Sequence, residues 1–124
     1  MALIMVVDEE ADACRLLARI LSAQGHEVHA FTKGREAIEW LRGATPDLAV
    51  LDITLRGLES IRVLEHVRTL DHATRILLIT GSPAVPITQR ALGLGVDGIL
   101  VKPVEIDEFE QWIKKALIVK KESC

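Results

Sequence analysis

The stretch that decides the fold is residues 46–57, PDLAVLDITLRG. Residues 48–51 within it are all apolar, and they lead directly into a carboxylate, Asp52. A short apolar run between turn residues is typical of a strand that is buried on both faces of a parallel sheet. Ligands of such sheets bind in the crevice at the carboxyl ends of the strands. We therefore expect Asp52 to lie at the ligand-binding edge of an α/β sheet.

The composition predicts a single globular domain without a membrane segment. The chain has 124 residues, of which 49% are hydrophobic and 27% are charged, and these values are ordinary for a soluble domain. No apolar run approaches the roughly 20 residues that a membrane-spanning helix needs. The amino-terminal MALIMVVDEE lacks the basic region and the cleavage site of a signal peptide. We expect a cytoplasmic protein.

Charge, aromatic content and cysteine content argue against a nucleic-acid-binding protein and against a disulfide-rich protein. The net charge is −3, with both signs interspersed, so direct binding to nucleic acid is not expected. Aromatic residues make up only 3% of the chain, which disfavours a surface for stacking bases. Cys14 and Cys124 are far apart, and Cys14 lies on the apolar stripe of a predicted helix. A disulfide framework is therefore not expected, and a reducing compartment fits best.

Short apolar segments alternate with helical patterns along the whole chain. The predicted strands are residues 3–7, 27–31, 48–51, 76–79 and 99–101. A helix follows each strand, and apolar residues recur at helical spacing in 11–21, 37–41, 58–70 and 109–117. The remaining helix follows a proline-containing turn at 82–86 and ends near Gly93 or Gly95. This order predicts a doubly wound, five-stranded parallel sheet with five helices on its two faces. The domain would span residues 1–119, and 120–124 would be a frayed tail or the start of a linker.

Polar side chains follow four of the five predicted strands. They are Asp8 with Glu9, Asp52, Thr80 and Lys102. Carboxylates gathered at one sheet edge repel one another unless a cation lies among them. Oxygen ligands with open positions favour Mg²⁺, and the lysine and threonine are donors for an anion beside it. The pattern indicates a site where a carboxylate accepts a phosphoryl group.

Four segments together carry a family resemblance. They are VVDEE at 6–10, PDLAVLDITLRG at 46–57, ILLITGS at 76–82 and DGILVKP at 97–103. In this order and at this spacing the chain resembles the receiver domain of two-component response regulators over essentially its whole length. The resemblance implies a flavodoxin-like sheet with strand order 2-1-3-4-5.

The resemblance also implies how the phosphoryl group is received. Asp52 would be the nucleophile, and its donor would be a phosphohistidine on a sensor histidine kinase or phosphotransfer protein, or a small acyl phosphate. Mg²⁺ would be held by Asp8, Glu9, Asp52 and the backbone carbonyl of Thr54.

Other residues would act on the phosphoryl group once it is bound. Lys102 would pair with its oxygens, and a cis peptide bond would precede Pro103. Thr80 would turn its hydroxyl onto a phosphoryl oxygen and draw the following loop, with Gly81 and Ser82, along with it. Ser82, together with the residue at position 54, would tune the access of water.

Three positions depart from the family pattern. Glu9 replaces the commoner aspartate, and Arg56 stands where a proline usually follows. Ile99 stands where the family usually has Tyr or Phe, and a β-branched aliphatic side chain cannot perform the usual ring movement. We expect the output transition to pass through the loops at 54–58 and 81–86 instead.

The leading prediction is a phosphoacceptor regulatory domain, which is not an enzyme acting on other substrates. Its output would come from a partner or from a region outside this chain, with a possible homodimer formed by the last two helices and the fifth strand. The alternative kept open by Glu9 and Ile99 is an interaction module of this fold that does not respond to phosphate.

Enzymes of similar fold are a third class. A flavin-binding protein needs a hydroxyl- and glycine-rich loop after the first strand, where this chain has residues 8–10, DEE. Phosphatases with an aspartate nucleophile usually carry a second aspartate two residues later, where this chain has Thr54. The motif GLGVDG at 93–98 precedes a strand rather than following one, so it does not indicate dinucleotide binding.

Overall fold

The computed structural model describes residues 1–53, 58–70 and 73–122. Strands and helices alternate in chain order: β1 (Leu3–Val7), α1 (Ala11–Ala23), β2 (Glu27–Phe31), α2 (Gly34–Leu41), β3 (Leu48–Ile53), α3 (Leu58–Leu70), β4 (Arg75–Thr80), α4 (Pro86–Gly93), β5 (Gly98–Val101) and α5 (Ile106–Glu122). No helix in this described part of the chain is both long enough and apolar enough to cross a bilayer.

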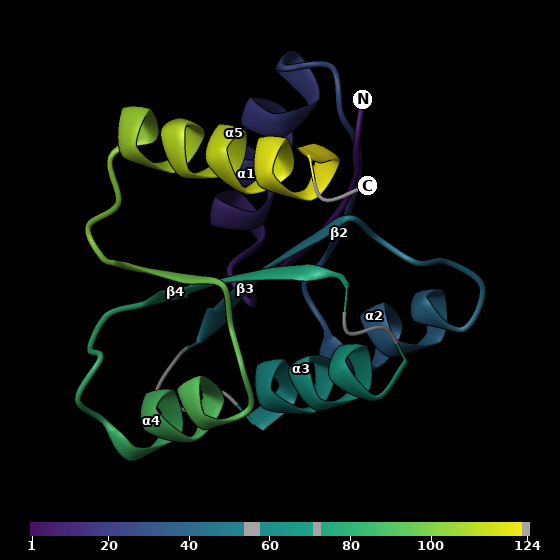
Figure 1. The fold of residues 1–124 in the computed structure, drawn as a ribbon. Helices are drawn as coiled ribbons and strands as arrows, with labels where there is room; N and C mark the ends of the chain where they lie inside the picture. Colours follow the sequence, from purple (N-terminus) through teal and green to yellow (C-terminus); the bar gives the residue numbers. More distant parts are fainter. Residues whose placement is uncertain (54–57, 71–72, 123–124) are drawn as a thin grey trace.

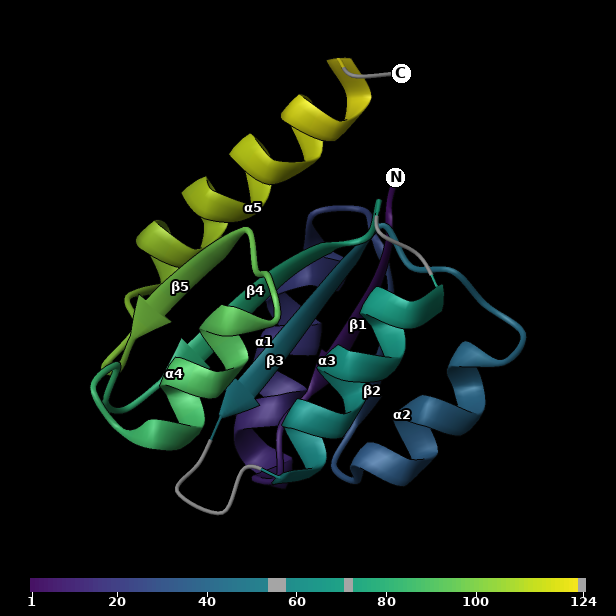
Figure 2. The same ribbon diagram turned by 60° about the horizontal axis from the view of Figure 1, so that its bottom comes forward.

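The strands form one parallel sheet in the order β2-β1-β3-β4-β5. Helices α1 and α5 cover one face, and α2, α3 and α4 cover the other (Figure 1). The predicted fold class and strand order are confirmed, and the alternating strand β2 lies at an edge as expected. Because all strands are parallel, their carboxyl ends lie at the same end of the sheet (Figure 2).

Successive residues of each strand face opposite layers. On β3, Ala49 and Leu51 pack in the core beneath α2, α3 and α4, which we call the α2–α4 layer. Leu48 and Val50 pack in the core beneath α1 and α5, which we call the α1/α5 layer. The central strand therefore needs apolar residues at every position, and this explains the uninterrupted apolar run in the sequence.

Several element boundaries differ from the prediction, among them those of β3, β4 and α5. Strand β3 continues through Asp52 to Ile53, because Ile53 still pairs with Thr80 of β4. Thr80 is thus the last residue of a strand and not the first residue of a loop. Helix α5 extends to Glu122, past the predicted domain boundary at residue 119. Thr54 and Arg56 lie outside the described residues.

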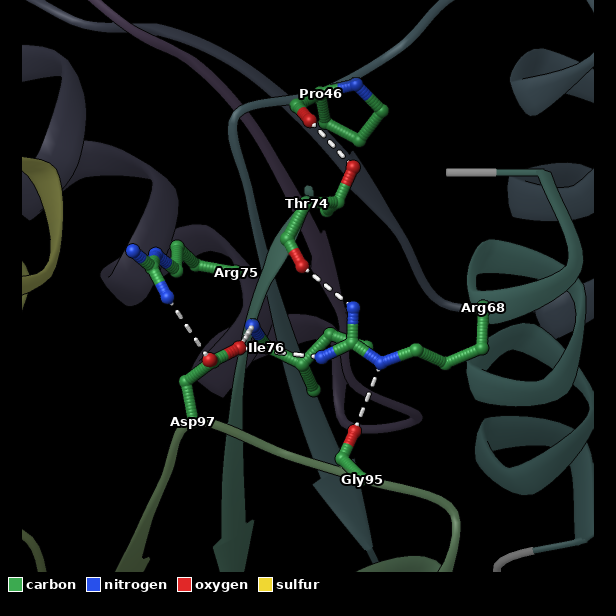
Figure 3. A network of polar contacts seen from close by, with 7 residues as sticks. All are labelled: Pro46, Arg68, Thr74, Arg75, Ile76, Gly95 and Asp97. Carbon is green, nitrogen blue, oxygen red and sulfur yellow. Dashed lines mark hydrogen bonds and ion pairs between the residues drawn. The ribbon is translucent and has the colours of Figure 1, made fainter. Parts of the chain in front are cut away.

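A polar network fixes the amino-terminal end of β4 (Figure 3). Arg68 of α3 donates to the carbonyl oxygens of Thr74, at 2.7 Å, and Gly95, at 2.9 Å. It also pairs with Asp97 at 3.1 Å, and the Asp97 carboxylate accepts the backbone N–H of Ile76 at 2.7 Å. This network ties α3, β4 and the segment before β5 together at the sheet edge opposite Asp52.

Candidate functional site

Asp52 lies near the carboxyl end of β3 and is only 3% exposed. Its Oδ2 is 2.8 Å from the Nζ of Lys102, which directly follows β5. The Lys102 side chain is 42% exposed, so the ion pair joins a buried carboxylate to an ammonium that reaches solvent. The structure thus brings together the predicted nucleophile and the predicted lysine.

The two carboxylate oxygens of Asp52 have different surroundings. Oδ2 pairs with Lys102. Oδ1 is buried and has no hydrogen-bond partner within residues 1–53, 58–70 and 73–122. The backbone carbonyl of Asp52 does have one, because it accepts the hydroxyl of Ser60 at 2.7 Å. Because no described donor contacts Oδ1, its lone pairs are available for a cation or for nucleophilic attack. Leaving a buried carboxylate oxygen without a donor is energetically costly.

Asp8 supplies a second buried carboxyl group beside Asp52. It follows β1, is 2% exposed, and its Oδ1 accepts the backbone N–H of Glu10 at 2.9 Å. Burial, together with the charge of Asp52, raises the pKa of Asp8 to about 6. An ordinary aspartate has a pKa near 3.8. Such a pair is stabilised by a cation.

Lys102 remains an ammonium in these surroundings. Partial burial lowers the pKa of Lys102, but the hydrogen bond and charge of Asp52, with the charges of Asp8 and Glu10, outweigh burial and raise it above 10.5. The site therefore presents a fixed positive charge directly against the Asp52 carboxylate.

These groups line a pocket of about 560 Å³ that opens to solvent. Its polar lining comes from Asp8, Glu10, Asp52 and Lys102, and its apolar lining includes Leu16, Leu17 and Val104. An anionic group that enters the pocket would meet Lys102 beside the nucleophile.

Glu9 is one predicted residue that does not line this pocket. Its side chain is exposed, and Glu10 rather than Glu9 lines the pocket. No set of three or more His, Cys, Asp or Glu side chains in the described ranges is arranged to hold a metal ion. The chain bends at Glu9 and Glu10, where the Glu10 N–H donates to the Asp8 carboxylate.

Thr80 is a second predicted residue that lies outside the pocket. It is buried, but its Oγ1 contacts the Oγ1 of Thr88 on α4 at 3.1 Å, and Thr80 does not line the Asp52 pocket. Strand alternation explains this placement. Leu78 packs in the α2–α4 layer, and Thr80, two residues later, faces the same layer. Val50 packs in the α1/α5 layer, and Asp52 follows it on that side.

Four other predicted positions lie in the described part of the chain. The peptide bond between Lys102 and Pro103 is cis, as expected. Gly81 lines the Asp52 pocket, and the backbone N–H of Ser82 donates to Thr80 Oγ1 at 3.2 Å. Ile99 is partly buried against the α2–α4 layer.

Comparison with known proteins agrees with this geometry. A sequence model of the response regulator receiver domain matches residues 4–114. The chain belongs to this family.

Similar proteins differ in how much of their length the receiver domain represents. The transcriptional regulatory protein TcrA of Mycobacterium tuberculosis is 37% identical over 108 residues, covering 86% of this chain but only 42% of TcrA. Sporulation initiation phosphotransferase F of Bacillus subtilis is 26% identical over 117 residues, and 94% of each protein is covered.

The fold of this receiver domain also occurs in solved structures. The CheY-like receiver domain protein of Methanospirillum hungatei superposes with a TM-score of 0.89 at 24% identity, covering 100% of this chain and 99% of the other. That likeness supports the fold alone.

Two residues near the site were missed by reasoning from sequence. Glu10 lines the pocket, and Thr88 contacts Thr80 from α4. The alternation of residues along β4 was the available signal for Thr88. It places Thr80, two residues after Leu78, in the layer that contains α4. The turn after β1 gave no comparable signal for choosing Glu10 over Glu9.

Proposed function

We propose that this receiver domain accepts a phosphoryl group on Asp52 and passes the change of state to a partner or to a region outside this chain. One observation carries the proposal. Asp52 is a buried carboxylate in an open pocket, with Oδ2 held by an ammonium and Oδ1 without a hydrogen-bond donor among the described residues. This arrangement favours a nucleophile over a structural ion pair, in which both oxygens would accept hydrogen bonds.

The reaction moves a phosphoryl group between two nucleophiles. The bond from phosphorus to an imidazole nitrogen of a phosphohistidine breaks, and a bond from phosphorus to an Asp52 oxygen forms. The imidazole nitrogen keeps the bonding electron pair and takes up a proton. With an acyl phosphate as donor, the carboxylate leaves instead. Lys102 holds its positive charge next to the phosphoryl oxygens, so the chain contributes mainly position and charge neutralisation.

Mg²⁺ is the metal that this site suits. Asp8 and Asp52 are two buried carboxylates, one with an oxygen that no described residue contacts by a hydrogen bond. Mg²⁺ usually takes one or two carboxylates together with phosphate oxygens and waters. The proposed ligands are Asp8, Asp52 and the backbone carbonyl of Thr54, with the exposed Glu9 acting through a metal-bound water. When bound, Mg²⁺ would neutralise charge on the transferring phosphoryl group.

The proposed phosphoryl donor is a sensor histidine kinase or a phosphotransfer protein. The similarity to a sporulation phosphotransferase supports transfer as the activity, and the greater length of TcrA supports an output outside this domain. A homodimer through α4, β5 and α5 is proposed because Val101 and Ile106 are 43% and 49% exposed. The free thiol of buried Cys14 agrees with a reducing cytoplasm.

Phosphoryl uptake is tested by intact-protein mass spectrometry after incubation with acetyl phosphate and Mg²⁺. We expect the wild-type chain to gain the mass of one phosphoryl group, and Asp52→Asn or an excess of EDTA to abolish the gain. Asp12→Asn is the matched control, because the Asp12 side chain is 94% exposed. A gain retained in Asp52→Asn would contradict the proposed acceptor.

A phosphorylation-independent interaction module is the second candidate. It is favoured by the aliphatic Ile99 at the position of the family's switch aromatic and by the exposed side chain of Glu9. Under this hypothesis the mass stays unchanged with acetyl phosphate at every Mg²⁺ concentration, while a partner binds wild type and Asp52→Asn equally.

A further inference from the structure

The Thr80 hydroxyl is fully occupied by hydrogen bonds on the side away from Asp52. Thr80 is 1% exposed and Thr88 is 0% exposed, and their Oγ1 atoms are 3.1 Å apart. Thr80 Oγ1 also lies 3.2 Å from the carbonyl oxygen and 3.2 Å from the nitrogen of Ser82.

The donors and acceptors of this cluster have one consistent assignment. A hydroxyl has one proton to donate and two lone pairs to accept with. The Ser82 N–H donates to Thr80, and Thr80 donates to the Ser82 carbonyl. The remaining lone pair of Thr80 then accepts the hydroxyl proton of Thr88. In this state Thr80 has no proton left for a phosphoryl oxygen.

The backbone of Thr80 is fixed by both neighbouring strands. Thr80 pairs with Ile53 of β3 and Val101 of β5, and its carbonyl oxygen accepts the Lys102 N–H at 2.8 Å. Reorientation of the hydroxyl therefore requires a change in the side chain and in the Ser82 segment. The strand itself stays in place.

We propose that Thr88 is a positioning residue that holds the Thr80 hydroxyl on α4 until a phosphoryl group on Asp52 competes for it. This inference rests on the proposed phosphoryl acceptance by Asp52. When Thr80 turns its proton to a phosphoryl oxygen, the buried Thr88 hydroxyl loses its acceptor. Because an unpaired buried hydroxyl is unfavourable, α4 shifts until Thr88 finds a new partner.

Helix α4 can respond in this way without an aromatic residue at position 99. Ile99 packs in the same layer as Ala91 of α4, but its side chain has no polar atom with which to detect the state of Thr80. Thr88 is joined to Thr80 by a hydrogen bond and belongs to α4 itself. The signal thus passes from β4 to α4 through two hydroxyl groups.

The first test measures the affinity of the chain for beryllium fluoride, a phosphoryl mimic, with Mg²⁺ by isothermal titration calorimetry. In wild type, binding must break the Thr80–Thr88 hydrogen bond. Thr88→Val keeps the shape and removes that cost, so we expect roughly two- to tenfold tighter binding. Thr88→Ser keeps a hydroxyl and should bind like wild type. In a Thr80→Ala background, Thr88→Val should have no effect.

The second test follows hydrogen exchange of the α4 amides. Beryllium fluoride should increase exchange across residues 87–93 in wild type and Thr88→Ser, and should cause no change in Thr88→Val. Thr88→Ala is a second hydroxyl-free variant, to be used if Thr88→Val does not fold. A merely structural Thr88 would change thermal stability without changing either response.

The outcomes separate this inference from the proposed function. If wild type takes up neither a phosphoryl group nor beryllium fluoride, the proposed function fails and the inference fails with it. If wild type binds the mimic but Thr88→Val and Thr88→Ser bind equally well, with equal α4 exchange, the inference alone is overturned.

Discussion

At the scale of single residues, the buried carboxyl group of Asp8 makes folding depend on pH. Its pKa is about 6 in the folded chain and near 3.8 in an unfolded one. Between these values the native state binds more protons, so stability falls as pH rises through this window. A difference of this size corresponds to about 3 kcal/mol. The buried carboxyl pair therefore reduces the stability of the metal-free chain at neutral pH.

Asp8→Asn should reverse this loss. We expect the variant, in EDTA at pH 7, to have a free energy of unfolding about 2–3 kcal/mol above that of wild type. At pH 4 the two should nearly coincide, because Asp8 is then protonated in the native state. Urea unfolding at both pH values measures the difference. Asp12→Asn, at an exposed position, should track wild type, and an equal gain at pH 4 and pH 7 would refute the titration of Asp8.

The direction of side chains was harder to predict than their identity. The sequence places Asp8, Asp52 and Lys102 after apolar strands, and the structure brings all three together. In the sequence Thr80 follows an apolar run in the same way, but in the structure its side chain faces the opposite layer. Successive residues of a strand face opposite layers, so the direction of Thr80 depends on where β4 ends and on its register with β3.

Among the elements, β1, β2 and α3 have the predicted bounds. A uniform apolar run marks β1 in the sequence, an alternating pattern marks β2, and apolar residues at helical spacing mark α3. Strand β3 extends beyond its apolar run, since hydrogen bonding to β4 continues past Asp52. Pairing between strands, which no local pattern encodes, sets that boundary. Contacts between side chains of different elements are likewise not encoded by a local sequence pattern.

The packing of α5 on β5 depends on one such contact. A Cβ atom at Gly98 would overlap the ring of Trp112, so the absence of a side chain at residue 98 admits the indole. Gly98→Ala should lower the free energy of unfolding by about 1–3 kcal/mol through overpacking. The measurement is chemical denaturation followed by tryptophan fluorescence.

A matched glycine controls that experiment. A Cβ atom at Gly43 would meet no atom of the described residues within 4 Å, so Gly43→Ala should not be destabilising. Replacing Trp112 by leucine in the Gly98→Ala background should recover part of the loss, because the smaller side chain leaves space for the methyl group. No recovery would indicate that Gly98 acts through the backbone.

At the scale of the whole molecule, the carboxyl ends and the amino ends of the strands carry different groups of residues. The edge at the carboxyl ends of the strands holds Asp8, Asp52 and Lys102, and there Asp52 Oδ1 accepts no hydrogen bond from any described residue. The opposite edge is fixed by Arg68 and Asp97 through charge-assisted hydrogen bonds. This division predicts that stability and phosphoryl chemistry can be changed separately.

Arg68→Ala tests that separation. The variant leaves the carbonyl oxygens of Thr74 and Gly95 without the guanidinium and removes one partner of Asp97. Because charge-assisted hydrogen bonds of a largely buried group are lost, we expect the free energy of unfolding to fall by about 2 kcal/mol. Arg62→Ala, at an exposed position of the same helix, should cost far less. Below the unfolding transition, Arg68→Ala should take up phosphoryl groups from acetyl phosphate at the wild-type rate. A slower rate in the folded variant would mean that the two edges are mechanically coupled through β4.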